Sequence, residues 1–256
     1  VLVVGGGVAG LQAALTAGRA GARVIVFEQS DHWGGRAPVD GGVINGGPVD
    51  KYVDETLAAL AKMENVQLRL RTMGAGVYDH GYALGYERLT DHPPETAGPR
   101  HRLWRVRAAQ IITATGAIER PLSFAGNDIP GVMLASALRD YVVNYGVSVG
   151  DRTVVVTNND NADLTAIALK HAGRDVPVIR DARVLPDDRG LVEQAKALGI
   201  RVLMGHAISS VKGGKRVTGV SICAQAGEGA VLEEIACDAV AMSGGWSPVV
   251  HLWSHC

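Results

Sequence analysis

The chain has 256 residues, enough for one large or two smaller domains. Its 25 lysines and arginines nearly balance its 26 aspartates and glutamates, and no basic block stands out, which argues against nucleic acid or an anionic membrane as a partner. No apolar run is long enough to span a bilayer. The three cysteines lie far apart and form no C-x-x-C pair, so we expect reduced thiols, a cytoplasmic protein and no metal site.

The beginning of the chain carries its strongest pattern. An apolar run at residues 1–4 predicts a buried strand, residues 8–20 predict an Ala-rich helix, and residues 23–27 predict a second buried strand. The turn between the first strand and the helix reads G-x-G-x-x-G, and Glu28 follows the second strand. Glycine turns are common, but this order of elements is typical of a Rossmann-like dinucleotide site, so a merely structural turn is the weaker alternative.

Each part of this pattern has a physical role at a pyrophosphate. Gly5 permits the tight turn, Gly7 allows close approach of the backbone to the phosphates, and Gly10 lets the helix lie close to the sheet. The N–H groups at the helix start, from Val8 onward, favour an anion. Glu28 is placed to accept hydrogen bonds from a ribose diol, and its charge favours NAD or FAD over NADP because a 2′-phosphate would be repelled.

The next part of the chain predicts a loop, one helix and several strands. Residues 36–45 read as the loop and residues 50–62 have helical spacing. Strands are predicted, in chain order, at residues 67–71, 76–80, 83–88, 101–107 and 110–115, with a polar turn at residues 90–100. The middle three would form a β-meander. The last strand runs into Ala114-Thr115-Gly116, whose small residues would let the backbone pack against a nucleotide.

The second half of the chain predicts another βαβ unit. An amphipathic helix at 134–145 precedes it. Within the unit, strands are predicted at residues 152–157, 176–180 and 201–204, helices at 163–172 and 191–198, and a β-rich stretch at 207–224. Its first turn has no glycine, and Asp160 there would repel a pyrophosphate. Only Asp181 is available as the ribose acid. We therefore expect a retained scaffold, and a working second nucleotide site is the alternative.

A final strand, predicted at residues 231–243, ends in Gly244-Gly245-Trp246 and would return the chain to the first domain. The expected fold is α/β: a Rossmann-like FAD/NAD(P)-binding domain with a β-meander, residues 1–120 and 240–256, and a second, inserted Rossmann-like domain, residues 121–239. Because Val1 already lies in a strand, we expect a piece of a longer polypeptide.

These motifs, together with Gly34-Gly35-Arg36 after Glu28, resemble the flavoprotein superfamily with two dinucleotide-binding domains. More narrowly, the sequences at 76–92, 126–147 and 243–256 resemble the large (alpha) subunit of heterotetrameric sarcosine oxidase. The similarity runs through essentially the whole chain, and these strings are specific to that family.

The resemblance implies an oxidoreductase that acts on CH–NH donors and demethylates sarcosine to glycine, formaldehyde and hydrogen peroxide. It implies that amine oxidation takes place at a flavin of the beta subunit, that this module holds NAD, that beta and smaller subunits are partners, and that this chain has no catalytic residue. Two alternatives stay open: an FAD-binding subunit of a related amine or opine dehydrogenase, and a non-redox interaction module stabilised by a nucleotide.

The remaining candidate residues surround the same pocket. Gln29 would flank Glu28, and Trp33 would either flank the phosphates or shield the glycine loop. Arg36 could pair with an anionic oxygen. Gly34 and Gly35 are expected on the phosphate side of the pocket. The superfamily resemblance implies that Gly76 and Val77 form the edge that meets the adenine. Thr115 and Gly116 are expected to close the pocket, and Gly245 and Trp246 to approach its far end.

Overall fold

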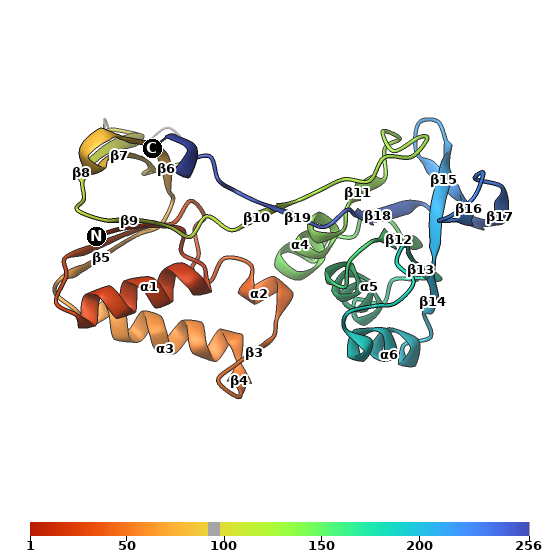
Figure 1. Cartoon of the computed structure of the whole chain (residues 1–256), viewed down its shortest axis with the longest axis horizontal. Helices are drawn as coiled ribbons and strands as arrows, with labels where there is room; N and C mark the ends of the chain where they lie inside the picture. Colours follow the sequence, from red (N-terminus) through yellow and green to blue (C-terminus); the bar gives the residue numbers. More distant parts are fainter. Residues whose placement is uncertain (92–97, 256) are drawn as a thin grey trace. The chain divides into compact units, whose positions relative to one another are not determined.

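The computed structural model describes residues 1–91 and 98–255. The chain forms two compact units, one made of Val1–Ala117 with the segment from Pro248 on, the other of Ile118–Ser247. Strands β10 (Ala117–Glu119) and β19 (Trp246–Pro248), through which the chain passes between the units, pair with each other (Figure 1).

The first unit is built on a parallel four-stranded sheet in the order β5-β2-β1-β9. Its strands are β1 (Leu2–Val4), β2 (Val24–Phe27), β5 (Val66–Arg69) and β9 (Ile111–Thr113). Helices α1 (Val8–Arg19) and α3 (Val49–Ala61) cover one face (Figure 1). A meander covers the other face, with strands β6 (Thr72–Tyr78), β7 (Tyr82–Arg88) and β8 (His101–Arg107).

Side-chain alternation along β1 explains why both faces of this sheet are covered. Val3 packs with the helices, whereas Leu2 and Val4 pack with the meander, and all three are buried. Short elements complete the unit: α2 (Ala37–Asp40), β3 (Val43–Ile44), β4 (Gly47–Pro48), η1 (Asp79–Gly81) and η2 (Trp253–His255). The predicted loop at 36–45 therefore contains α2 and β3, and most of the predicted turn at 90–100 lies outside the described residues.

The second unit has the same layers around a parallel five-stranded sheet in the order β11-β18-β12-β13-β14. Its strands are β11 (Val132–Leu134), β12 (Thr153–Thr157), β13 (Val178–Asp181), β14 (Arg201–Met204) and β18 (Ala239–Ser243). Helices on one face are α4 (Ala135–Tyr145), α5 (Asn161–His171) and α6 (Arg189–Ala197). An antiparallel sheet on the other consists of β15 (His206–Gly213), β16 (Val217–Ala224) and β17 (Val231–Ala236).

The structure differs from the sequence expectation at residues 231–247. The single strand expected at 231–243 is two strands, because the chain turns at Asp238, whose carboxylate accepts hydrogen bonds from the N–H groups of Asp151 and Arg152 at 3.0 and 2.9 Å. Strand β18 is buried throughout and pairs with β11 and β12 inside the second sheet. Residues 240–247, expected in the first domain, therefore belong to the second unit.

Candidate functional site

Two glycines of the first turn are required by the packing of the backbone. Gly5 has φ +110°, and a Cβ there would lie 2.1 Å from the carbonyl oxygen of Ala114. A Cβ at Gly10 would lie 1.8 Å from the carbonyl oxygen of Gly5. These distances are far below van der Waals contact, so helix α1, the turn and the end of β9 can approach this closely only with glycine at both positions.

Gly7 is a glycine for a different reason. Its φ of −73° and ψ of 180° suit any residue, and the nearest atom that a Cβ would meet is the Cα of Gly35 at 3.9 Å. Protein packing therefore leaves room for a Cβ at Gly7, at the N-terminus of α1. Among the described residues no side-chain hydrogen bond caps the start of this helix, so its first N–H groups, beginning at Val8, can receive an anion. The arrangement fits a pyrophosphate.

A second glycine pair faces this turn. Gly34 donates its N–H to the carbonyl oxygen of Gly6 at 2.9 Å and forms a parallel bridge with Gly7. Gly35 has φ +58°, and a Cβ there would lie 3.0 Å from the Cα of Gly7. The two loops thus meet backbone to backbone, which places Gly34 and Gly35 at the glycine turn; their position beside a phosphate stays a prediction.

Arg36 has a protein partner. Its guanidinium donates to both carboxylate oxygens of Asp40, one helical turn later, at 2.7 and 3.1 Å. The sequence suggested that Arg36 pairs with an anionic oxygen of the nucleotide. In the structure Asp40 supplies the anionic oxygens that Arg36 binds. A contact between Arg36 and the ligand therefore stays a prediction.

Glu28 holds the glycine turn. Its carboxylate is buried; Oε2 accepts the N–H of Gly6 at 2.7 Å, and Oε1 accepts the N–H and hydroxyl of Ser30 at 2.7 and 2.6 Å. A carboxylate has about four lone-pair sites, so a position is left for a ribose hydroxyl. Gln29 lies beside it and is exposed. Ser30 was not predicted, although a serine two residues after the acid was visible in the sequence.

The aromatic residue of this region contacts the turn. A Cβ at Gly6 would lie 2.5 Å from the ring of Trp33, which also packs against the helical side of the sheet. Of the two roles considered for Trp33, the structure supports shielding of the glycine loop, and it explains why position 6 is also a glycine.

The predicted adenine edge lies on β6, an outer strand of the meander. Gly76 and Val77 are buried there, and the Val77 side chain is 4% exposed within the layer between meander and sheet. A ligand could therefore meet the backbone of these residues and not the valine side chain. Beside β6, residues 77–81, 108–111, 113 and 252–253 line a cavity of about 360 Å³, which Val77 alone of the predicted site residues borders.

Thr115 and Gly116, which were predicted to close the pocket, bind the segment from Pro248 on, with which the chain returns to the first unit. The Thr115 hydroxyl donates to the carbonyl oxygen of Val249 at 2.6 Å, and the N–H of Val249 donates to the carbonyl oxygen of Gly116 at 3.0 Å. Gly245 and Trp246 belong to the second unit, where the carbonyl oxygen of Gly245 accepts the N–H of Arg120 at 2.8 Å. Their approach to the first pocket stays a prediction.

The second unit repeats the layout of the first in register. Gly5 directly follows β1 and Asn158 directly follows β12, and Gly7 and Asp160 directly precede helices α1 and α5. The corresponding positions lie 153 residues apart in the pairs Gly5 and Asn158, Gly7 and Asp160, Gly10 and Asp163, Glu28 and Asp181, and Ser30 and Arg183. Asp181 even accepts the N–H of Arg183, as Glu28 accepts that of Ser30. Every glycine of the motif has thus been replaced by an amide or acid.

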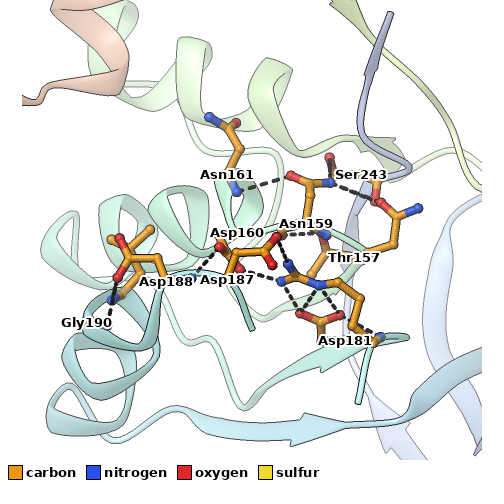
Figure 2. A network of polar contacts seen from close by, with 12 residues as sticks. Thr157, Asn159, Asp160, Asn161, Asp181, Asp187, Asp188, Gly190 and Ser243 are labelled. Atoms are coloured by element: carbon orange, nitrogen blue, oxygen red, sulfur yellow. Dashed lines mark hydrogen bonds and ion pairs between the residues drawn. The ribbon is translucent and has the colours of Figure 1, made fainter. Parts of the chain in front are cut away.

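In the second unit, side chains of the protein fill the region around the helix start. Asp160 pairs with the guanidinium of Arg183 and accepts the N–H of Asp188 at 2.6 Å (Figure 2). Arg183 also donates to Asp181 at 2.6 Å and to Asp187 at 2.9 Å. These aspartates would repel a phosphate, and Arg183, the cation that could attract one, is already neutralised. A scaffold role for this unit remains the better interpretation.

Within residues 1–91 and 98–255, no three His, Cys, Asp or Glu side chains come together in a way that could hold a metal ion. The same residues contain no helix with the length and apolar character needed to cross a bilayer.

Comparison with known proteins places this geometry in context. The chain is 40% identical over its whole length to a sarcosine oxidase subunit alpha of Rhizobium meliloti (strain 1021), of which it spans 25%. It is 39% identical, over 99% of its length, to a sarcosine oxidase subunit alpha of Corynebacterium sp. (strain P-1), of which it spans 27%. The chain thus spans about a quarter of the length of these curated relatives.

Solved structures confirm the predicted fold class. L-proline dehydrogenase from P. horikoshii matches with a TM-score of 0.71 at 22% identity, over 99% of this chain and 43% of that one. T. acidophilum thioredoxin reductase matches with a TM-score of 0.72 at 17% identity, over 98% of this chain and 78% of that one. A family model described as pyridine nucleotide-disulphide oxidoreductase matches residues 1–254. The chain belongs to the pyridine nucleotide-disulphide oxidoreductase family.

Proposed function

We propose that the first unit binds one dinucleotide, NAD, as the nucleotide module of the alpha subunit of a sarcosine oxidase. The observation that supports this most directly is that protein packing does not require glycine at position 7, at the start of α1, whereas it does require Gly5 and Gly10 of the same turn. The identity to sarcosine oxidase alpha subunits over the whole chain supports the enzyme class.

In the proposed dinucleotide site, which we call the cradle, different residues would bind different parts of the ligand. The cradle consists of Gly7, Val8, Glu28, Gly34 and Gly35 together with the rest of the glycine turn. The N–H groups from Gly7 and Val8 onward would receive the pyrophosphate, with Gly34 and Gly35 on its other side. Glu28 would accept a ribose hydroxyl while it holds Gly6 and Ser30. A 2′-phosphate would meet this buried carboxylate, which favours NAD over NADP. Bound NAD supplies a nicotinamide that accepts or donates hydride; the protein residues described here bind and orient it.

The proposed reaction belongs to the whole complex. Sarcosine would be demethylated to glycine, formaldehyde and hydrogen peroxide, with the amine oxidised at a flavin of the beta subunit and with beta and smaller subunits as partners. The chain described here would contribute the dinucleotide module and no group that touches the amine.

Mass spectrometry of the small molecule released on denaturation tests the proposal. Release of about one NAD per chain is expected, together with a spectrum of the isolated chain that lacks flavin bands. Release of FAD would favour the related amine or opine dehydrogenase instead, and release of no dinucleotide would contradict the cradle. Sarcosine-dependent peroxide formation by the assembled complex separates the oxidase from a non-redox module.

A further inference from the structure

One buried carboxyl group of the second unit is used by neither the proposed cradle nor the Arg183 network. Asp163 is the third residue of α5 and is 1% exposed. Its Oδ1 has no hydrogen-bond partner among the described residues. Most buried polar atoms in proteins have a partner, so this one needs an explanation. Its position corresponds to Gly10 of the first unit, where no side chain could fit.

The surroundings of Asp163 are acidic. Four charged groups act on it. They are Asp160 in the turn before α5, Asp181 at the end of β13, Arg183 in the loop after β13 and Asp188 directly before α6. From α4, Arg139 donates to the side-chain and main-chain oxygens of Asn161 at 2.9 and 2.8 Å. Strands β12 and β18, which also pack against α5, carry no titratable residue.

The nearby guanidinium cannot readily neutralise a further carboxylate. Each of the three nitrogens of Arg183 already donates to Asp160, Asp181 or Asp187 (Figure 2). An ionised Asp163 would therefore be a buried negative charge near the carboxylates of Asp160, Asp181 and Asp188, and Arg183 already pairs with two of these. Burial raises the pKa of Asp163 to about 7, and the charges of Asp181 and Asp160 act in the same direction.

We propose that the start of α5 is a proton-sensitive contact, closed against the sheet when Asp163 is neutral and loosened when Asp163 is ionised. The first turn of α5 is held by the N–H of Asn161, which donates to Asn159 Oδ1 at 3.1 Å, and by the N–H of Asp163, which donates to the carbonyl oxygen of Asp160 at 3.1 Å. Exposure of the carboxylate to water relieves its charge but breaks this turn.

The direction of the pH effect follows from the two states. In the opened state Asp163 is solvated and has an ordinary pKa, so the closed state binds the proton more tightly. The closed state is therefore fully stable at low pH and loses stability as the pH rises toward 7, then levels off. One proton released on opening changes the opening equilibrium by about tenfold per pH unit within this range.

Hydrogen–deuterium exchange with mass spectrometry on the intact protein tests the proposal between pH 5 and 8, after correction for the intrinsic exchange rates. Protection of peptides from α5 should fall by up to about tenfold per pH unit to pH 7, while peptides from α1, which carries Gly10 at this position, should not change. In the isosteric variant Asp163→Asn, protection of α5 should be independent of pH. Asp187→Asn is the matched control, because its side chain is 91% exposed in the same network, and it should keep the wild-type profile.

Three results would overturn the proposal: flat protection of α5 in the wild type, a fall shared equally by α1, or an unchanged fall in Asp163→Asn. Asp163→Gly, which restores the residue of the first unit, should also remove the pH dependence and provides a second variant. Should neither variant fold, the wild-type profile decides: a fall confined to α5 supports the proposal, and a flat profile overturns it.

Discussion

The N–H of Gly6 donates to Oε2 of Glu28 at 2.7 Å, across 22 residues of sequence. This bond joins the glycine turn to the residue that the sequence assigns to the ribose. The same acid therefore holds the glycine turn and, in the proposed site, would also present an oxygen to the ribose.

We predict that Glu28→Ala lowers the free energy of unfolding by about 1–3 kcal/mol, because the buried donors of Gly6 and Ser30 lose their acceptor. Affinity for the dinucleotide should fall as well. Urea unfolding and isothermal titration measure the two effects. Gln29→Ala, at the exposed neighbour, should stay within about 0.5 kcal/mol of the wild type. Equal stability of Glu28→Ala and the wild type would show that the bond does not hold the turn.

In the second unit, the replacement that tests the carboxylate network is Arg183→Ala. Loss of the guanidinium would leave the carboxylates of Asp160 and Asp181 without their cation, and we expect a destabilisation of roughly 3 kcal/mol. The exposed Arg189 offers a matched control, since Arg189→Ala removes the same charge without these contacts. Thermal unfolding of both variants beside the wild type makes the comparison. Similar losses for the two would mean that only net charge matters.

Cys237 should be unreactive in the folded protein. Burial raises the pKa of its thiol to about 11, and the neighbouring Asp238 adds to the shift. The thiolate is the nucleophile, so at pH 8 almost no reactive form is present. Peptide mapping after iodoacetamide treatment should find Cys237 modified only when urea is added. Modification under native conditions would contradict its burial.

The sequence predicted the glycine turn and its helix well, because the constraints on them are local. The spacing of Gly5, Gly7 and Gly10 reflects contacts within one turn and its adjoining helix, and such contacts depend on few other residues. The absence of glycine in the second turn was equally visible, since Asp160 occupies the position of Gly7.

The details that were missed depend on partners distant in the sequence or on choices between nearby groups. The sequence did not indicate that Asp40 pairs with Arg36, whose contact to a phosphate stays a prediction. The boundary near residue 240 was misplaced because Asp238 turns the chain by accepting N–H groups some 86 or 87 residues away. No pattern along the sequence reports such a pair.

Gly10 should tolerate no side chain. Its Cβ would lie 1.8 Å from the carbonyl oxygen of Gly5, so Gly10→Ala must push α1 away from the turn. We expect a loss of about 3 kcal/mol or more in the free energy of unfolding. Gly21→Ala is less informative as a control, because Gly21 has φ +82°; Gly7→Ala, in the same turn and without strain, is the better one.

Gly7→Ala also tests the central claim most directly. A Cβ at Gly7 would make only an ordinary contact, 3.9 Å from the Cα of Gly35, so the variant should unfold at the same temperature as the wild type. It should nevertheless bind NAD at least about tenfold more weakly in isothermal titration, a loss of about 1.4 kcal/mol, because the methyl group occupies the place of the pyrophosphate. Unchanged affinity in a folded Gly7→Ala protein would contradict a dinucleotide cradle at this turn.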